Sequence, residues 1–227
     1  MKSLRVQTAM RRRLRWPLPL AMGHCRGQSC ARQLDALGDH AAACSRSGLL
    51  KLRSRPLEKI WVRILREGGA RVRENVLLRD TGVAVDPSDG RNIEIVATGL
   101  QTAHGLPVAI DTTMVSPLHA DGTPFAGAEA IAGVALRRAE RHKRSTYSEL
   151  AASPQLRLLT AGVEAGGRMS SESRKLIKEL AVSRSQSELP FLRPSVARAF
   201  RNRWVIMASV AAQDALAATS DNDGVGF

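Results

Sequence analysis

The stretch "LPVAIDTTMVSPL", residues 106–118, is the segment on which the fold of this chain depends. Its β-branched residues and flanking prolines are typical of a buried β-strand. Asp111 stands among apolar neighbours, and a lone carboxylate inside an apolar strand is costly unless it is paired, hydrogen-bonded or bound to a cation. The stretch therefore predicts a core strand that carries a polar site.

Upstream of this strand the chain predicts one helix and two further strands. "RPLEKIWVRILREGG", residues 55–69, has apolar residues at helical spacing, with Pro56 early and a glycine pair at its end. "ARVRENVLLRD", residues 70–80, alternates apolar and charged positions as a strand does. "VAVDPSDGR", residues 83–91, contains a proline and a glycine and predicts a turn. "NIEIVATG", residues 92–99, predicts the next strand.

Downstream, one long helix, a fourth strand and two more helices are expected. Residues 126–150 have an alanine-rich apolar face and a cationic remainder, and "LRLLTAGVEAGG", residues 156–167, predicts a strand. Residues 170–185 predict a capped helix and residues 195–220 a terminal one. The order α-β-β-β-α-β, followed by two helices, predicts an α/β fold with a mixed sheet flanked by helices.

Two acids on neighbouring predicted strands indicate one shared site. Glu94 is embedded in "IEIV" and Asp111 in "VAIDTTMV". Hard carboxylate oxygens suit Mg²⁺ or Mn²⁺, which orients a water molecule and neutralises charge on a phosphate. In the alternative interpretation each acid lies at a strand end and faces solvent, while its neighbours form the core.

The three cysteines of the chain all lie in "CRGQSCARQLDALGDHAAAC", residues 25–44. Cys25, Cys30, His40 and Cys44 have the spacing C-x4-C-x9-H-x3-C, and thiolates with one imidazole suit a tetrahedral zinc ion. His24 is an alternative ligand beside Cys25. Free cysteines are also often buried as small hydrophobic residues, which is the interpretation without a metal.

Composition and charge limit the classes of partner. The chain has 227 residues, 44% of them apolar, and a formal net charge of +13, which favours a polyanion, most often nucleic acid. DNA is the expected partner, with RNA as an alternative, and the oligomeric state stays open. Aromatic residues make up only 4%, which disfavours a single-strand stacking platform. We expect no membrane association, because no apolar run approaches the roughly 18 residues of a membrane span.

The N-terminal residues and the cysteine count bear on localisation. No acidic residue precedes Asp35, and the two prolines in "WPLPLAMG", residues 16–23, argue against a signal peptide. Three clustered cysteines do not form a secreted disulfide framework, so a reducing compartment is expected. We expect a nuclear protein with a basic arm; a mitochondrial protein with a transit peptide is the alternative.

The order of elements and the cysteine cluster together resemble a known protein family. The segments are "GDHAAACSRSG", residues 38–48, "LRSRPLEKIWVRILREGGARVRENV", residues 52–76, and "IDTTMVSPL", residues 110–118. They resemble the carboxy-terminal part of site-specific non-LTR retrotransposons, which carry a restriction-like endonuclease downstream of the reverse transcriptase. The likeness covers roughly residues 10–215 and implies a restriction-endonuclease-like core that nicks a DNA target.

The resemblance assigns roles residue by residue. The zinc ligands fall on the four cluster residues, and the first catalytic acid falls on Glu94, although "RNIEIV" lacks the usual preceding proline and has Glu in place of Asp. Asp89 is a rival for this role. The second acid falls on Asp111, so that both acids would hold Mg²⁺ or Mn²⁺.

The remaining catalytic assignments also come from the resemblance. Thr113 stands where a restriction enzyme has lysine, and family members use a basic residue on the following helix instead. Lys143 and Tyr147, four residues apart and on one helical face, match that pattern. Glu58 on the first helix is the candidate third acid. For Lys143 the alternative is a solvated charge run, and for Tyr147 it is half-buried packing.

These expectations divide the chain into five parts and leave two classes of function. The parts are a basic arm (1–24), a CCHC-type zinc-binding module (25–48), a restriction-like endonuclease core (49–165), a C-terminal helical extension (166–218) and a disordered tail (219–227). One function is a Mg²⁺-dependent DNA endonuclease for target-primed reverse transcription. The other is a catalytically decayed, zinc-dependent nucleic-acid-binding module; a structural protein of a ribonucleoprotein is a third interpretation.

Overall fold

The computed structural model describes residues 3–18, 23–25, 27, 30–44, 50–101 and 105–222. From residue 50 onward its elements follow the predicted order of helices and strands. The elements are α1 (Ser3–Arg13), α2 (Asp39–Ala43), α3 (Leu50–Glu67), β1 (Arg71–Leu77), the short 3-10 helix η1 (Leu78–Thr81), β2 (Asn92–Thr98), β3 (Val108–Val115), α4 (Val134–Thr146), α5 (Ser148–Ala152), β4 (Arg157–Glu164), α6 (Ser171–Ser185) and α7 (Arg193–Asn222).

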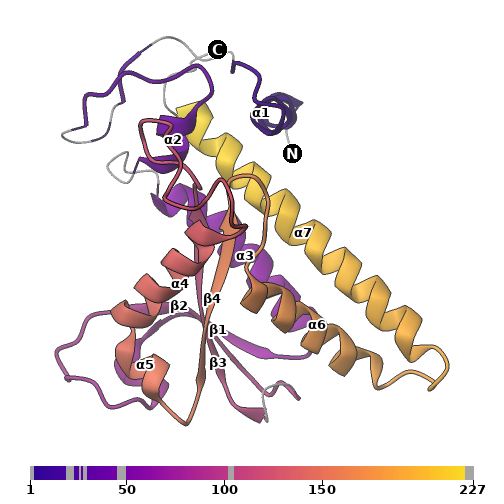
Figure 1. The fold of residues 1–227 in the computed structure, drawn as a ribbon. Coiled ribbons are helices and arrows are strands. Elements are labelled where there is room, and N and C mark those ends of the chain that lie inside the picture. Colours follow the sequence, from indigo (N-terminus) through magenta and orange to yellow (C-terminus); the bar gives the residue numbers. More distant parts are fainter. Residues whose placement is uncertain are drawn as a thin grey trace.

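The four strands form one mixed sheet in the order β1-β2-β3-β4. β1 pairs with β2 and β2 with β3 in antiparallel fashion, whereas β3 and β4 are parallel. A parallel pair needs a crossover connection, and α4 and α5 supply it between β3 and β4. The prediction of an α/β fold with a mixed sheet flanked by helices is therefore confirmed (Figure 1).

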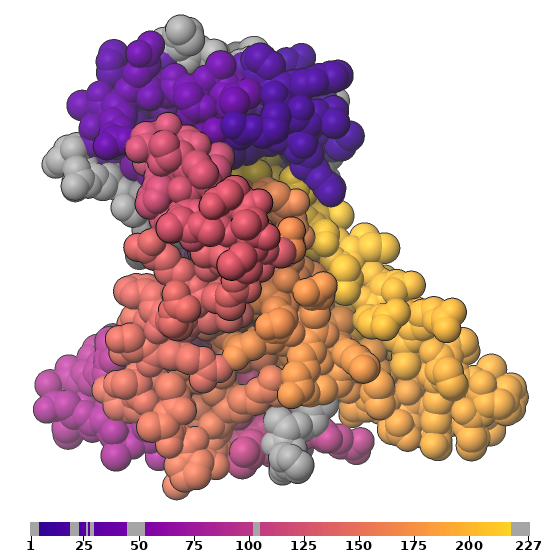
Figure 2. All heavy atoms as spheres, in the orientation of Figure 1, coloured from indigo at the N-terminus to yellow at the C-terminus, as the bar shows by residue number. Residues whose placement is uncertain are grey.

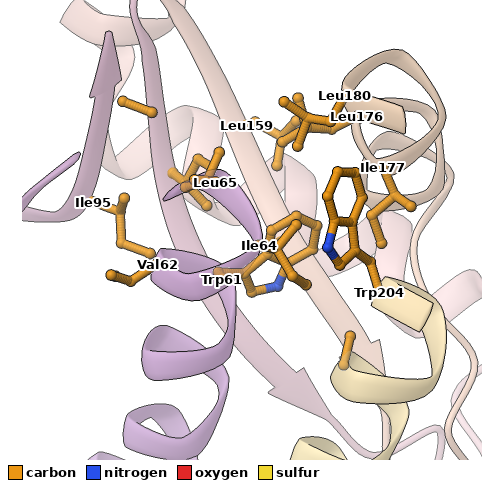
Figure 3. Close-up of a cluster of buried hydrophobic side chains, with 14 of the residues drawn as sticks. Trp61, Val62, Ile64, Leu65, Ile95, Leu159, Leu176, Ile177, Leu180 and Trp204 are labelled. Atoms are coloured by element: carbon orange, nitrogen blue, oxygen red, sulfur yellow. The ribbon is translucent and has the colours of Figure 1, made fainter. Parts of the chain in front are cut away.

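The main hydrophobic core lies between one face of the sheet and helices α3, α6 and α7. Trp61 and Leu65 of α3 pack there with Ile110 of β3 and Leu159 of β4, and all four are buried (Figure 3). The Trp204 side chain of α7 is fully buried, and its Nε1 donates a 2.8 Å hydrogen bond to Glu67 Oε2. Because the indole N–H has this partner, the tryptophan can be buried without an unsatisfied donor.

A second hydrophobic cluster covers the opposite face of the sheet. It joins Tyr147 and Leu150, at the end of α4 and in α5, to Val96 of β2, Ala109 of β3 and Leu158 of β4. Successive side chains of a strand alternate between the two faces, so the odd and even positions of β3 serve different clusters. Figure 1 shows α4 and α5 on one side of the sheet and α6 and α7 on the other.

The boundaries of three predicted helices were wrong. The helix expected over residues 126–150 begins only at Val134, because Gly127 and Gly133 adopt φ values of 79° and 77° in the turns before it. It also ends at Thr146, and the separate helix α5 follows Tyr147. α3 begins at Leu50, five residues before the predicted start, with Pro56 inside it, and α7 begins at Arg193 in place of residue 195.

The N-terminal residues pack on the C-terminal half of the chain. α1, which lies in the predicted basic arm, runs beside α7, and Arg5 forms a 3.1 Å ion pair with Asp214. Figure 2 shows this N-terminal segment in indigo, lying against the residues that follow β3. At the other end, α7 is helical as far as Asn222, and residues 223–227 of the predicted tail lie outside the described residues. None of the described helices combines the length and the apolar character that a membrane crossing requires.

Candidate functional site

The backbone around α2 is arranged by Asp35. Its carboxylate accepts hydrogen bonds from the backbone N–H groups of Leu37, Asp39 and His40, at 3.0, 3.0 and 2.7 Å. These are donors at the start of α2 that have no partner within the helix. Gly38, with φ of 71°, makes the left-handed turn that precedes the helix. As a result, His40 and Cys44 are presented from one short, capped helical turn.

The side chains of Cys25, Cys30, His40 and Cys44 converge, with all four potential ligand atoms within 4.8 Å of one another. The Sγ atom of Cys44 lies 3.8 Å from that of Cys25 and 3.7 Å from that of Cys30, and Cys30 Sγ lies 3.4 Å from His40 Nε2. Zinc bonds of about 2.3 Å to sulfur and 2.0 Å to nitrogen place tetrahedral sulfurs about 3.8 Å apart, and a sulfur and a nitrogen about 3.5 Å apart. The predicted cluster therefore exists and could bind zinc.

Further contacts hold the cluster residues in place. His40 Nδ1 lies 3.1 Å from the carbonyl oxygen of Ala120, which fixes the ring with Nε2 toward the thiols. Arg53 of α3 donates to the carbonyl oxygens of Ala42 and Cys44, at 2.7 and 2.9 Å. The alternative ligand His24 is exposed, bridges to Gln33 and is not one of the converging four.

The thiols of the cluster differ in acidity. Burial raises the pKa of Cys25 to about 11, whereas a hydrogen bond from the Arg32 backbone N–H leads the effects that lower the pKa of Cys30 to about 7. Zinc binds the deprotonated thiolate, so zinc binding competes with protonation of each cysteine. Near neutral pH, Cys30 is therefore more readily available as a thiolate ligand than Cys25.

Glu94 and Asp111 come together where β2 and β3 separate. The paired register runs from Ala97↔Val108 to Ile95↔Ile110, and Glu94 and Asp111 occupy the next position. Past this point Glu94 Oε2 accepts 2.6 Å hydrogen bonds from both the backbone N–H and the hydroxyl of Thr112. The Glu94 side chain thus takes the place of a strand partner for Thr112.

Lys143 reaches this pair of acids from α4. Its Nζ lies 2.8 Å from Asp111 Oδ1 and 3.0 Å from Oδ2, and Asp111 is only 1% exposed. Only the Oδ2 contact has the geometry of a hydrogen bond; the buried Oδ1 atom accepts none from the described residues. Asp111 therefore keeps a buried oxygen that is aimed at a cation but lacks a hydrogen-bond donor.

Burial and mutual repulsion set the ionisation of this site. Desolvation, followed by the charge of Asp111 and a smaller contribution from Glu58, raises the pKa of Glu94 to about 7. Burial, followed by the charge of Asp111, raises the pKa of Tyr147 above its usual value. The Tyr147 hydroxyl donates a 3.1 Å hydrogen bond to the carbonyl oxygen of Asn92. At neutral pH the site therefore holds a neutral tyrosine and a glutamate near its titration midpoint.

The structure separates Asp89 from the other acids. Asp89 lies in the turn before β2, where Arg91 binds its carboxylate at 2.6 Å and lowers its pKa. Arg91 also pairs with Glu149 at 2.7 Å. Glu94, and not Asp89, is thus the acid that the structure brings beside Asp111.

The role of Thr112 was not predicted from the sequence. Thr112 holds the Glu94 carboxylate, and the repeated threonine in "DTT" was its only signal in the sequence. Among the described residues, no second group of three metal-binding side chains converges as the cysteine cluster does, so Glu58 does not complete such a group with Glu94 and Asp111.

No protein-family model matches the chain, and no curated protein matches it.

Proposed function

We propose that this protein is a metal-dependent DNA endonuclease domain that nicks target DNA for target-primed reverse transcription. One observation carries the proposal: the buried Asp111 carboxylate, beside Glu94 on the adjacent strand, receives Lys143 from the crossing helix at 2.8 Å. Two acids at neighbouring positions of a splayed strand pair, with a lysine on one of them, form a set of groups that can support metal-dependent phosphodiester hydrolysis. The proposal includes the restriction-endonuclease-like core that the sequence predicts for residues 49–165.

The acids suit a hard divalent cation. Asp111 Oδ1 is buried 2.8 Å from Lys143 Nζ and accepts no hydrogen bond from the described residues, and burial, followed by the charge of Asp111, raises the pKa of Glu94 to about 7. Glu94 and Asp111 would hold Mg²⁺ or Mn²⁺, whose preferred ligands are carboxylate oxygens. Such an ion, when bound, neutralises phosphate charge and lowers the pKa of a water molecule.

The other side chains have distinct roles in the proposed reaction. Lys143 compensates Asp111 in the free protein, and it is placed to stabilise the extra negative charge on the phosphate during attack by water. Tyr147 stays protonated because its pKa is raised, so it acts as a hydrogen-bond donor and supports β2 through Asn92. Thr112 orients Glu94 through two hydrogen bonds. Glu58 acts only through its charge on Glu94.

The zinc module and the charge of the chain support DNA as the substrate. The cluster could hold zinc, and His40 connects it to the segment after β3 through Ala120. A net charge of +13 favours attachment to phosphates, which releases counterions and makes binding strongly dependent on salt. DNA positioning by the zinc module would thus take place next to the acids.

Nicking of supercoiled plasmid tests the proposal. We expect the wild-type protein to convert supercoiled to open-circular DNA with Mg²⁺ or Mn²⁺, and Asp111→Asn to lower the rate at least about a hundredfold. Glu164→Gln is a matched control, because Glu164 is also a buried strand acid but pairs with Arg168 at 3.2 Å. Equal cleavage by wild type and Asp111→Asn would refute the proposal.

A second function, zinc-dependent binding of nucleic acid without cleavage, is favoured by one observation. Glu94 is engaged by Thr112, and no third acid converges with Glu94 and Asp111 among the described residues. In this case Asp111 and Lys143 form an ion pair that only holds α4 on the sheet. Zinc-dependent DNA binding with no nicking by either metal would support this function.

A further inference from the structure

A cavity of about 570 Å³ lies between the zinc module and α4. Ala42 and Ala43 of α2 border it on one side, and Ala139 and Lys143 of α4 border it on another. The end of β3 and the segment carrying Leu118 to Phe125 complete its lining. Because Lys143 both lines the cavity and binds Asp111, the cavity adjoins the candidate catalytic acids.

The lining of the cavity combines cations with apolar side chains. Arg138, His142 and Lys143 contribute basic groups from successive turns of α4, whereas Met114 and Leu118 contribute apolar surface. No acidic side chain is among the described residues that line it. An occupant with an anionic part and a flat or apolar part fits this lining, whereas a purely inorganic anion would leave the apolar surface uncovered.

One wall of the cavity contains two aromatic rings in tilted contact and a guanidinium group over one of them. The Phe125 ring lies 4.0 Å from the His119 ring, measured between centroids, and the Arg138 guanidinium carbon lies 4.9 Å over the same Phe125 ring. Arg138 is exposed and lines the cavity. Guanidinium planes and apolar side chains are the surfaces on which proteins stack unpaired bases.

We propose that this cavity receives one unpaired nucleotide of the bound nucleic acid. The base would lie among Met114, Leu118 and Ala139, and the phosphate on its strand would contact Arg138, His142 and Lys143. A cavity of this volume falls in the range of about 300 to 1,000 Å³ that suits a single small molecule. The inference rests on the proposed function, because it places a displaced nucleotide beside the acids of the endonuclease.

An unpaired nucleotide has a charged phosphate and a flat base, which would explain why the cavity combines basic and apolar side chains. A base inside a duplex is stacked on both faces, so only a base that has left the stack can insert between the walls of such a cavity. Unstacking costs a few kcal/mol in a perfect duplex and less beside a mismatch or a nick. The cavity would therefore favour DNA that is already distorted or open near the cleavage position.

Fluorescence of 2-aminopurine tests the inference. The probe is a single-stranded oligonucleotide, or a duplex with one unpaired base, with 2-aminopurine scanned along the strand and bound to zinc-loaded Asp111→Asn protein without Mg²⁺. The fluorescence of this base changes when it leaves its stacked neighbours. We expect one position to respond differently from all others on binding, and the same position to respond in the mismatched duplex but not in the perfect one.

Two variants separate the cavity from the general affinity for DNA. Ala139→Phe fills the cavity without changing charge and should remove the position-specific signal. Arg138→Ala should weaken binding of the unpaired substrate about tenfold. Arg141→Ala is the matched control, because Arg141 is exposed on the same helix but does not line the cavity. Thermal unfolding of each variant checks that the protein still folds; Ala139→Leu replaces Ala139→Phe if the latter does not.

The outcomes distinguish this inference from the proposed function. Uniform fluorescence at every position, or a signal that Ala139→Phe and Arg138→Ala leave unchanged, would overturn the inference even if plasmid nicking succeeds. A position-specific signal that Ala139→Phe abolishes would support the inference even if no DNA is nicked, and it would then identify a binding site for unpaired nucleotides in a non-cleaving protein.

Discussion

The cysteine cluster and the pair of acids differ in how the chain assembles them. The cluster is formed by four residues within residues 25–44, and one capped helical turn presents two of them. Glu94, Asp111 and Lys143 come from two strands and a crossing helix, and only the packed sheet brings them together. The first site therefore takes its side chains from one local segment, whereas the second depends on the global fold. Each prediction below tests that contrast.

The largest expected effect is the loss of the zinc module when one ligand is removed. Binding of structural zinc contributes on the order of 10 kcal/mol to the folding of small zinc modules. Cys44→Ser should lower bound zinc from about one equivalent per chain and should make residues near the cluster sensitive to protease. Elemental analysis and limited proteolysis measure these two effects, and the sheet should remain folded by circular dichroism.

His24→Ala is the control for the zinc prediction, because His24 is exposed and outside the converging four. Zinc content should be unchanged in this variant. A reduced preparation of the wild-type protein with no bound zinc would contradict the assignment of the cluster as a metal site.

The second effect concerns the global fold and the ion pair between Lys143 and Asp111. Removing one partner of a buried pair costs about 3 to 5 kcal/mol, but the Lys143 side chain keeps 26% exposure, so we expect about 2 kcal/mol for Lys143→Met. The double variant Lys143→Met with Asp111→Asn should recover most of this loss, because no uncompensated charge remains buried. Urea unfolding of both variants measures the coupling.

Arg141→Met is the control on the same helix, and we expect it to change the free energy of unfolding by less than about 0.5 kcal/mol. If Lys143→Met is as harmless as this control, the ion pair does not hold α4 on the sheet. Zinc content should be equal in all of these variants, since the cluster does not depend on the pair.

The third effect, comparable in size to the second, is a pH dependence due to Glu94. Its pKa is about 7 in the folded protein against 4.5 ordinarily, so between these values the folded state keeps a proton that the unfolded state has lost. Stability should therefore fall as the pH rises from about 4.5 to 7, by up to roughly 3 kcal/mol. Glu94→Gln should remove this decline, and Mg²⁺ should reduce it in the wild type. Unfolding curves across this interval measure it; identical pH profiles would contradict the burial of charge at Glu94.

The contrast between a site formed within one segment and a site formed by the packed sheet also explains which features could be predicted from the sequence. The helix with Trp61, the strands and the cysteine cluster follow from local periodicity and spacing, and the structure has them in the predicted order. The predicted start of α4 was wrong because the alanine-rich run favours a helix locally, but Gly127 and Gly133 adopt left-handed turns that interrupt it before Val134. Thr112 was missed because its role depends on where two strands diverge, which no local pattern encodes.

The hydrogen bond between His40 Nδ1 and the carbonyl oxygen of Ala120 has a consequence for dividing this chain into separate pieces. A cut near residue 48 would look harmless, because it falls between the last cysteine and α3. It would remove Ala42 and Ala43 from the cavity and leave Arg53 without its two carbonyl acceptors. The shorter protein would keep its sheet and both acids yet present an altered surface to its substrate. The segment that carries the cysteine cluster therefore forms one wall of the cavity. It cannot be removed or replaced as if it were an independent domain.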